Sequence, residues 1–208
     1  MLLAPLLLLL ATDTIPLRPA EHPLVFDGHA DSAEYGAASA MIARPAGAIP
    51  VWLRRDGDFI YLAAAIADRS WYWGDDFVVS LDIRGDGGPA PGHDDFQWYF
   101  RRVADSSVVF RGDAGKWRAP QDDPDWRLGT AREGGGWEVR VLSDSAGWSI
   151  EMRLDPAYFT EGGARPPRLA LRVFDNEPMG WFPWPRPAGI RQPTEVERRP
   201  ELWAVVGR

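Results

Sequence analysis

The apolar residues of this chain recur at every second position in short runs, and no stretch keeps a helical period for three turns. Residues 76–83 (DFVVSLDI) show the pattern clearly, because successive side chains of a strand point to opposite faces of its sheet. Residues 96–103 and 148–154 repeat it, and clusters of Gly, Pro and Asp separate the runs. The sequence therefore predicts an all-β fold, an antiparallel β-sandwich of the jelly-roll or immunoglobulin-like kind, in a single domain.

The predicted strands are short and regularly punctuated. Residues 59–67 are apolar on both faces, which is typical of a central strand covered on both sides. Residues 155–159 (DPAYF) predict one short helical turn, because proline is tolerated at the first helical position. Strands are predicted at residues 25–27, 39–43, 51–55, 59–67, 76–83, 96–103, 107–111, 137–142, 148–154, 169–174 and 202–206.

The composition argues against several classes of function. The net charge of -7 over 208 residues disfavours a nucleic-acid partner, because phosphate binding needs a basic surface. The chain has no cysteine, which excludes a disulfide framework and a thiolate metal site. Its three histidines are scattered, which argues against a zinc site made of several histidines.

The N-terminal segment carries an apolar run over residues 2–11, which is too short to span a bilayer and has the length of a signal-peptide core. No basic residue precedes the run and no clear cleavage site follows it, so the signal is weak. We expect export to the periplasm or the exterior; the alternative is a disordered apolar start on a cytoplasmic protein. Residues 14–23 (TIPLRPAEHP) are interpreted as a proline-broken linker, which leaves the domain at residues 24–208.

The eleven tryptophans fall into three groups. Five lie in alternating strands and are predicted core residues: Trp52, Trp98, Trp137, Trp148 and Trp203. Two lie in an irregular segment that they are expected to pin down, Trp117 and Trp126. The remaining four are predicted to lie in two loops, each beside Asp or Asn: Trp71 and Trp73 before residues 76–83, and Trp181 and Trp184 after the strand that ends near Asp175.

Loop tryptophans are costly to expose unless something covers them. A sugar ring suits them well, because its flat C–H face stacks on an indole while its hydroxyl rim needs Asp, Asn, Gln or Arg as hydrogen-bond partners. An unpaired buried hydroxyl costs on the order of 1–3 kcal/mol, so the polar ring supplies the specificity. The pattern favours a site lined by aromatic and polar side chains that binds a saccharide or polysaccharide.

The order of several motifs resembles a known family. FDGHADSAEYG, VWLRRDGDFIYLAAAIADRS, WGDDFVVSLDIRG, GWSIEMRLDPAYF, RLALRVFDNEP and WFPWPRP follow one another over residues 24–206 as in the family 9 carbohydrate-binding modules, which belong to the DOMON-like β-sandwich group. The resemblance implies a non-catalytic sandwich that binds sugars in polysaccharide recognition or catabolism, often as an accessory to glycoside hydrolases.

The resemblance also implies particular site residues. Two tryptophans clamp the sugar, and the matching positions are Trp71 or Trp73 and Trp181 or Trp184. The polar contacts map onto Asp76, Gln97, Arg101 and Asn176. No cofactor is required, but structural calcium is common in such modules, and its possible ligands here are Asp82, Asp86, Asp94 and Asp95. A plain acidic hairpin loop is the alternative interpretation of these four aspartates.

Three other functions remain open at this point. A DOMON-like haem-binding electron-transfer module would take axial ligands from Met41, Met152, Met179 or His93. A glycosidase needs two carboxylates across a cleft; Asp75 and Asp76 lie on opposite strand faces, which leaves a weak pairing of Asp76 with Glu151. A structural or partner-binding sandwich would bury the loop tryptophans in an interface, with no partner protein indicated by the sequence.

Overall fold

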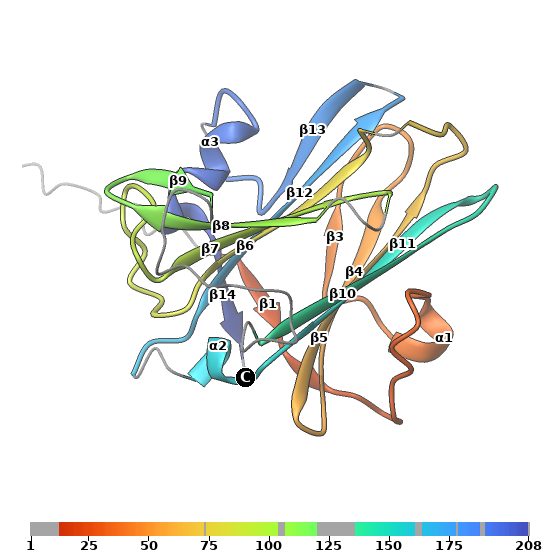
Figure 1. Cartoon of the computed structure of the whole chain (residues 1–208), viewed down its shortest axis with the longest axis horizontal. Coiled ribbons are helices and arrows are strands. Elements are labelled where there is room, and N and C mark those ends of the chain that lie inside the picture. Colours follow the sequence, from red (N-terminus) through yellow and green to blue (C-terminus); the bar gives the residue numbers. More distant parts are fainter. Residues whose placement is uncertain are drawn as a thin grey trace, which may run out of the picture.

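The computed structural model describes residues 13–72, 74–103, 107–119, 136–160, 164–177, 179–187 and 190–207, and they form two stacked sheets (Figure 1). Sheet A contains, in spatial order, β1 (Thr14–Pro16), β14 (Ala204–Gly207), β12 (Arg168–Asn176), β6 (Asp76–Asp82), β7 (Asp95–Arg101), β8 (Val108–Asp113) and β9 (Lys116–Arg118), and β13 (Met179–Trp184) also pairs with β12. Sheet B contains β10 (Trp137–Ser143), β11 (Gly147–Leu154), β5 (Phe59–Ala67), β4 (Ile49–Asp56) and β2 (Arg18–Pro19), and β3 (Ala40–Ile42) also pairs with β4.

The core lies between the two sheets and follows the two-residue period of the strands. Phe77, Val79 and Leu81 of β6 are fully buried and belong to one cluster with Leu62 of β5 and Ile150 of β11. Pairing within the sheets is antiparallel except for β1 with β14 and β2 with β4. The prediction of an all-β antiparallel sandwich is confirmed.

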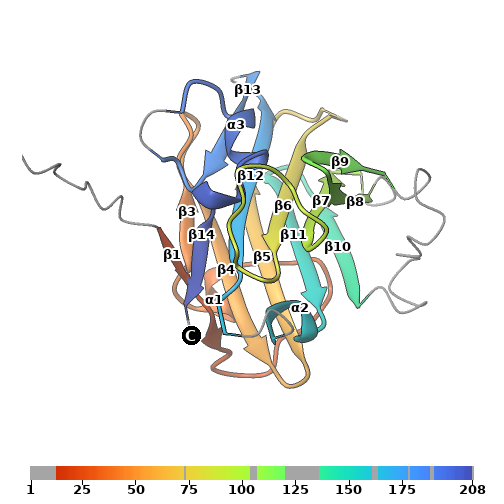
Figure 2. The same ribbon diagram turned by 90° about the vertical axis from the view of Figure 1, so that its left-hand side faces the viewer.

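Short helices lie outside the sheets (Figure 2). They are α1 (Ser32–Tyr35), α2 (Ala157–Thr160), α3 (Thr194–Glu197) and a 3₁₀ turn at Pro200–Leu202. The predicted helical turn in DPAYF corresponds to α2. None of the helices in the described ranges is long and apolar enough to cross a membrane.

The central strand β5 is buried on both faces, as its sequence predicts. Its outward side chains Tyr61 and Ala63 pack with Trp52 and Tyr35 beneath the segment that contains α1. Glu151 of β11 fastens this segment, because its buried carboxylate accepts hydrogen bonds from the backbone N–H groups of Asp27 and Gly28 and from the Tyr35 hydroxyl.

Two predictions near the N-terminus are wrong. Residues 14–23 are not a linker throughout, because β1 and β2 are strands of sheets A and B respectively. Residues 25–27 are not a strand, although Asp27 is held close to sheet B through Glu151. Proline breaks the alternation at residues 16 and 19, which hides two short edge strands from sequence analysis.

Most of the predicted core tryptophans are buried. Trp52, Trp98, Trp148 and Trp203 are each less than 5% exposed, and Trp137 packs half-buried against the core. Trp203 lies in a separate cluster with Ala170 and Val196, where Trp117 stacks on its ring at a centroid distance of 6.4 Å. Trp126 lies outside the described residues.

Candidate functional site

The outer face of sheet A gathers polar side chains from neighbouring strands. Asp76 pairs with Arg101 across β6 and β7, and Ser80 pairs with Gln97 four residues further along β6. Because alternate residues share a face, Asn176 of β12 lies on this face as well. The four residues that the family resemblance implies as polar contacts all lie on this face: Asp76, Gln97, Arg101 and Asn176.

Trp181 lies on the same outer face and at its edge. The Arg172 guanidinium lies 3.9 Å from the centre of its ring, and the rings of Phe174 and Tyr99 lie 5.1 and 6.0 Å away. Trp181 is only partly buried, so these contacts hold the indole while part of it stays accessible. We call Asp76, Gln97, Tyr99, Arg101, Arg172, Phe174 and Trp181 the outer-face cluster.

Trp184 lies on the opposite face of β13, three residues after Trp181, and packs half-buried against the core. The prediction that both tryptophans lie in a loop is wrong, because β13 pairs with β12 from Asn176 to Leu171. Pro183 is compatible with this edge strand, where a missing N–H leaves no partner unsatisfied. Of the two, only Trp181 faces the outer-face cluster.

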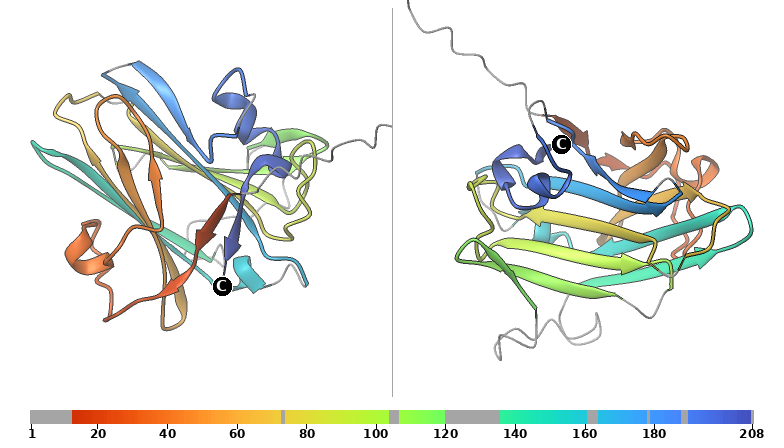
Figure 3. Two further views of the ribbon diagram at one scale, coloured as in Figure 1. Left: turned by 180° about the vertical axis from the view of Figure 1, so that it is seen from behind. Right: turned by 90° about the horizontal axis from the view of Figure 1, so that it is seen from above.

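Trp71 lies in the loop of residues 68–75 that joins β5 to β6, and its side chain is 66% exposed. Asp76, at the end of this loop, pairs with Phe174, which in turn pairs with Trp181. The loop therefore approaches the outer-face cluster at the edge of sheet A where β12 turns into β13 (Figure 3). Trp73 lies outside the described residues.

The charges of the cluster are compensated in pairs. Arg101 Nε lies 3.3 Å from Asp76 Oδ1. Burial raises the pKa of Asp76 to about 6, against an opposing effect of the Arg101 charge. Arg172 forms an ion pair with Glu197 of α3, and burial lowers the pKa of Arg172 and raises that of Glu197. Gln97 Nε2 donates to Ser80 Oγ at 3.2 Å.

Sequence analysis missed four members of this environment, Tyr99, Arg172, Phe174 and Glu197. Tyr99 carries a usable signal, because it alternates outward with Gln97 and Arg101 in β7. Arg172 stands between apolar residues in β12 and marks an outward position in the same way. Glu197 carries no such signal, because α3 reaches the sheet through tertiary packing only.

The four predicted calcium ligands lie around the connection from β6 to β7. Carboxylate oxygens of Asp82, Asp86 and Asp94 lie within 4.8 Å of one another. Asp82 is fully buried and accepts hydrogen bonds from the N–H groups of Gly85 and Gly87, and Asp95 lies opposite it in the β6–β7 register. Burial raises the pKa of Asp95 to about 8, with added repulsion from the neighbouring aspartates.

Two buried oxygens of this acidic group, Asp94 Oδ2 and Asp95 Oδ1, make no hydrogen bond within the described part of the chain. Hard cations such as calcium take several carboxylate oxygens as ligands, and a cation would compensate these charges. The donor set therefore fits calcium.

The residues of the other hypotheses are dispersed. Glu151 lies on the outer face of sheet B and holds the N-terminal segment, whereas Asp76 lies on the outer face of sheet A, so they do not flank one substrate. Met152 is a core residue with no exposed surface. Met41 and Met179 are exposed, and His93 lies 3.4 Å from Asp113.

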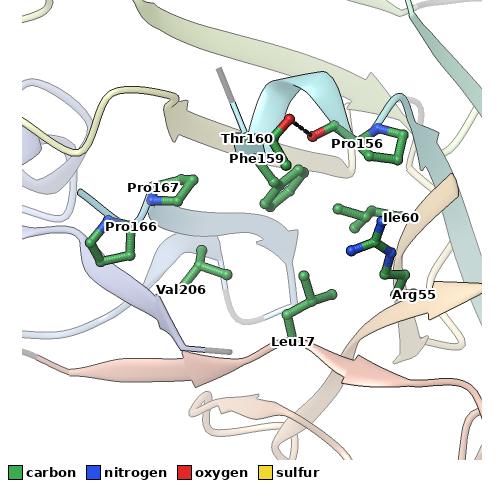
Figure 4. Close-up of a pocket in the computed structure, with 9 residues that line it drawn as sticks. All are labelled: Leu17, Arg55, Ile60, Pro156, Phe159, Thr160, Pro166, Pro167 and Val206. Carbon is green, nitrogen blue, oxygen red and sulfur yellow. Dashed lines mark hydrogen bonds between the residues drawn. The ribbon is translucent and has the colours of Figure 1, made fainter. Parts of the chain in front are cut away.

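A cavity of about 270 Å³ lies at the other end of the sandwich, where β5 begins (Figure 4). Its lining is mostly apolar and includes Leu17, Ile60, Phe159 and Val206, and Arg55 lies at one side of it beside Ile60. β5 runs from this end toward the loop of residues 68–75, so the cavity is separate from the outer-face cluster.

Two solved structures share this architecture along nearly the full chain. A family 9 carbohydrate-binding module from Caldicellulosiruptor kristjanssonii in complex with cellotriose matches with a TM-score of 0.63 and 13% identity, covering 94% of this chain and 95% of that one. A family 9 module from the same organism in complex with glucose matches with a TM-score of 0.55 and 13% identity, covering 93% and 96%. The chain has the fold of the family 9 carbohydrate-binding modules. No family model and no curated protein matches its sequence.

Proposed function

We propose that this protein binds saccharides without catalysis, through the outer-face cluster of sheet A and the adjoining Trp71. The observation that carries the proposal is the position of Trp181, a partly exposed indole whose strand lies beside the polar side chains of β12, β6 and β7. Modules of the same fold are seen in complex with cellotriose and with glucose, which supports β-linked glucose oligomers as the first ligands to test.

Each side chain has a distinct part in the proposed complex. The indoles of Trp181 and Trp71 offer apolar surfaces for the C–H faces of the sugar ring. Asp76 accepts hydrogen bonds from hydroxyls, Arg101 donates them, and Asn176 does both. Gln97 is only 4% exposed, so its part is to support this face through its hydrogen bond to Ser80. The contacts of Trp181 with Arg172, Tyr99 and Phe174 fix the indole before the ligand arrives, which reduces the ordering cost of binding.

We further propose that the protein serves in polysaccharide recognition or catabolism after export, and that calcium bound by Asp82, Asp86, Asp94 and Asp95 has a structural part. The calcium proposal is supported by the convergence of carboxylate oxygens and by the two buried oxygens without hydrogen bonds in the described part of the chain. The ion would neutralise the charge of the β6–β7 connection and order it.

Isothermal titration with cellotriose tests the proposed function. We expect Trp181→Ala and Trp71→Ala each to weaken binding by about tenfold or more, because the C–H face of the sugar ring loses the indole on which it stacks. Phe59→Ala is the matched control, because Phe59 is a partly exposed aromatic residue on sheet B at the far end of the sandwich. Unchanged affinity in both tryptophan variants, or no binding of any ligand on a glycan array with and without calcium, would contradict the proposal.

A further inference from the structure

The loop of residues 68–75 combines an exposed tip with buried ends. Trp71 is 66% exposed, whereas Asp68 and Asp75 on either side of it are 8% and 0% exposed. The loop passes from β5 in sheet B to β6 in sheet A, and nothing in its composition predicts that it is rigid. The buried carboxylates of Asp68 and Asp75 lie at the two ends of the loop, where a hydrogen-bond partner can fix its backbone.

Arg102 supplies this support from the end of β7. Its side chain is 2% exposed, and Nη1 lies 3.2 Å from Asp68 Oδ2 and 3.2 Å from Asp75 Oδ2. The same nitrogen donates to the Ser70 carbonyl, and Nη2 donates to the Asp68 carbonyl at 3.4 Å. The backbone N–H of Arg102 donates to the Asp75 carbonyl at 2.9 Å. One residue thus binds both ends of the loop and its middle.

Both neighbours of Trp71 in the chain are held by the carboxylates that Arg102 binds. The Ser70 N–H and hydroxyl donate to Asp68 Oδ1 at 2.9 and 2.7 Å. The Tyr72 N–H donates to Asp75 Oδ2 at 3.3 Å. The backbone on each side of Trp71 is therefore fixed, while the indole itself projects into solvent.

Arg102 also joins this loop to sheet B. Its Nε donates to Ser143 Oγ at 2.9 Å and Nη2 donates to the Gly147 carbonyl at 3.4 Å, on the two sides of the turn between β10 and β11. Arg101 and Arg102 are adjacent and point in opposite directions: Arg101 reaches Asp76 on the outer face, and Arg102 enters the interior. The first belongs to the proposed sugar site, and the second lies behind it.

Stability alone gives little reason for such a network. One guanidinium is shared by two carboxylates in a desolvated place, and replacing buried ion pairs by apolar residues of similar volume is often neutral or stabilising. We propose that Arg102 is a positioning residue for Trp71: it makes no contact with the sugar and presets the loop so that the indole meets the ligand in one orientation. This inference rests on the proposed function, and it names a determinant of the same site that the sequence does not reveal.

A double-mutant cycle on cellotriose affinity tests the proposal. Arg102→Met keeps the approximate volume and removes all five N–H donors of the guanidinium. We expect it to weaken binding by about tenfold in the wild-type background, and to cause no further loss in the Trp71→Ala background, since two residues that act as one unit are not additive. A merely structural role predicts the same loss in both backgrounds, and that result would overturn the proposal.

The control is Arg54→Met. Arg54 is also a buried arginine, 4% exposed, but it binds the backbone carbonyls of Tyr35 and Ala37 on the other side of the sandwich. We expect this variant to lower the melting temperature and to leave the cellotriose affinity unchanged. If Arg102→Met does not fold, Asp68→Asn weakens the same network with less disturbance and is expected to show a smaller loss with the same dependence on Trp71.

A measurement without ligand separates this inference from the proposed function. The chain has no cysteine, so Trp71→Cys accepts a nitroxide label at a single position. We expect the label to become more mobile with Arg102→Met and to stay restrained with Arg54→Met. A label that is equally restrained in both variants would overturn the inference. A wild-type chain that binds no ligand on the glycan array would overturn the proposed function, and the mobility of the label would then still test whether Arg102 positions the loop.

Discussion

Single positions on β13 decide which tryptophan serves the proposed site. Trp181 and Trp184 lie three residues apart in a strand, so they point to opposite faces of sheet A. Trp181 contacts Arg172, Tyr99 and Phe174 on the outside, and Trp184 packs against the core. One residue should therefore act on binding and the other on stability.

We predict that Trp184→Ala lowers the free energy of unfolding by about 3 kcal/mol or more, because it removes a large aromatic group from the core boundary. We expect its cellotriose affinity to stay within about twofold of wild type, because Trp184 points into the core and away from the outer face that is proposed to bind the ligand. Urea unfolding followed by titration calorimetry on the folded fraction measures both quantities. If Trp184→Ala keeps the stability of the wild type and loses the affinity for cellotriose, then Trp184 contacts the ligand and the assignment of binding to Trp181 alone is wrong.

The carboxyl group of Asp76 gives a second prediction at this scale. Burial raises its pKa from 3.8 to about 6 in the folded chain. Between these two values the folded chain holds a proton that the unfolded chain has released, so the contribution of Asp76 to the free energy of unfolding falls as pH rises from 3.8 to 6. Burial raises the pKa of Asp75 too, in the same direction.

We predict that Asp76→Asn flattens the pH dependence of stability in this window by on the order of 1–2 kcal/mol. The measurement is the difference in unfolding free energy between wild type and variant at pH 4 and at pH 7. Because Asp75 titrates in both proteins, the difference isolates Asp76. A constant difference across the window would mean that the pKa of Asp76 is not raised.

Strands of the sandwich interior could be predicted well from the sequence. The prediction for β5 agrees at both ends, and that for β6 differs by one residue. Residues 59–67 are a continuous apolar run that begins after the turn residues Asp56 and Gly57, and residues 76–83 have an apolar residue at every second position. β13 was missed because Gly180 and Pro183 within it, and Pro178 and Pro185 on either side of it, are residues typical of a loop. An edge strand has a neighbouring strand on one side only, so proline can occupy positions whose N–H would have no partner. Such residues interrupt the apolar alternation from which a strand is predicted.

The candidate site could be predicted only in part, for a related reason. The resemblance to the family 9 modules supplied Asp76, Gln97, Arg101 and Asn176, and strand alternation, which is local information, places the first three on outward faces. The support from Glu197 and Arg102 depends on contacts between residues 25 or more positions apart, such as Arg172 with Glu197 and Arg102 with Asp75. No periodicity encodes such pairs.

The connection from β6 to β7 gives a prediction for an element. We expect calcium to raise the melting temperature of the wild-type chain and a chelator to lower it, since ligands that bind the folded state stabilise it, by about 2.7 kcal/mol at one hundred times the dissociation constant. Asp86→Asn should weaken this response, because Asp86 is an exposed member of the group, whereas Asp82 also holds the loop backbone. Equal melting temperatures with calcium and with chelator would contradict calcium binding by these aspartates.

At the scale of the whole molecule, the first described strands join the two sheets. β1 pairs with β14 at one edge of sheet A, and β2, two residues later, pairs with β4 at one edge of sheet B. Ile15 is fully buried in the shared core, and Leu17 between the two strands packs against it. Residues 14–19 are therefore part of the sandwich, and any cleavage of the chain after Thr14 would remove residues that belong to it.

We predict that a chain starting at Asp13 unfolds at the same urea concentration as the full chain, and that a chain starting at Leu24 is less stable by at least about 3 kcal/mol. The second truncation removes Ile15 from the core, together with the backbone hydrogen bonds of Leu17 to Gly207 and of Ala20 to Arg55. Ile15→Ala in the full chain separates the core contribution from the strand pairing, since it keeps both strands. If the chain starting at Leu24 is as stable as the full chain, then β1 and β2 do not contribute to the stability of the sandwich, and the domain begins where sequence analysis placed it.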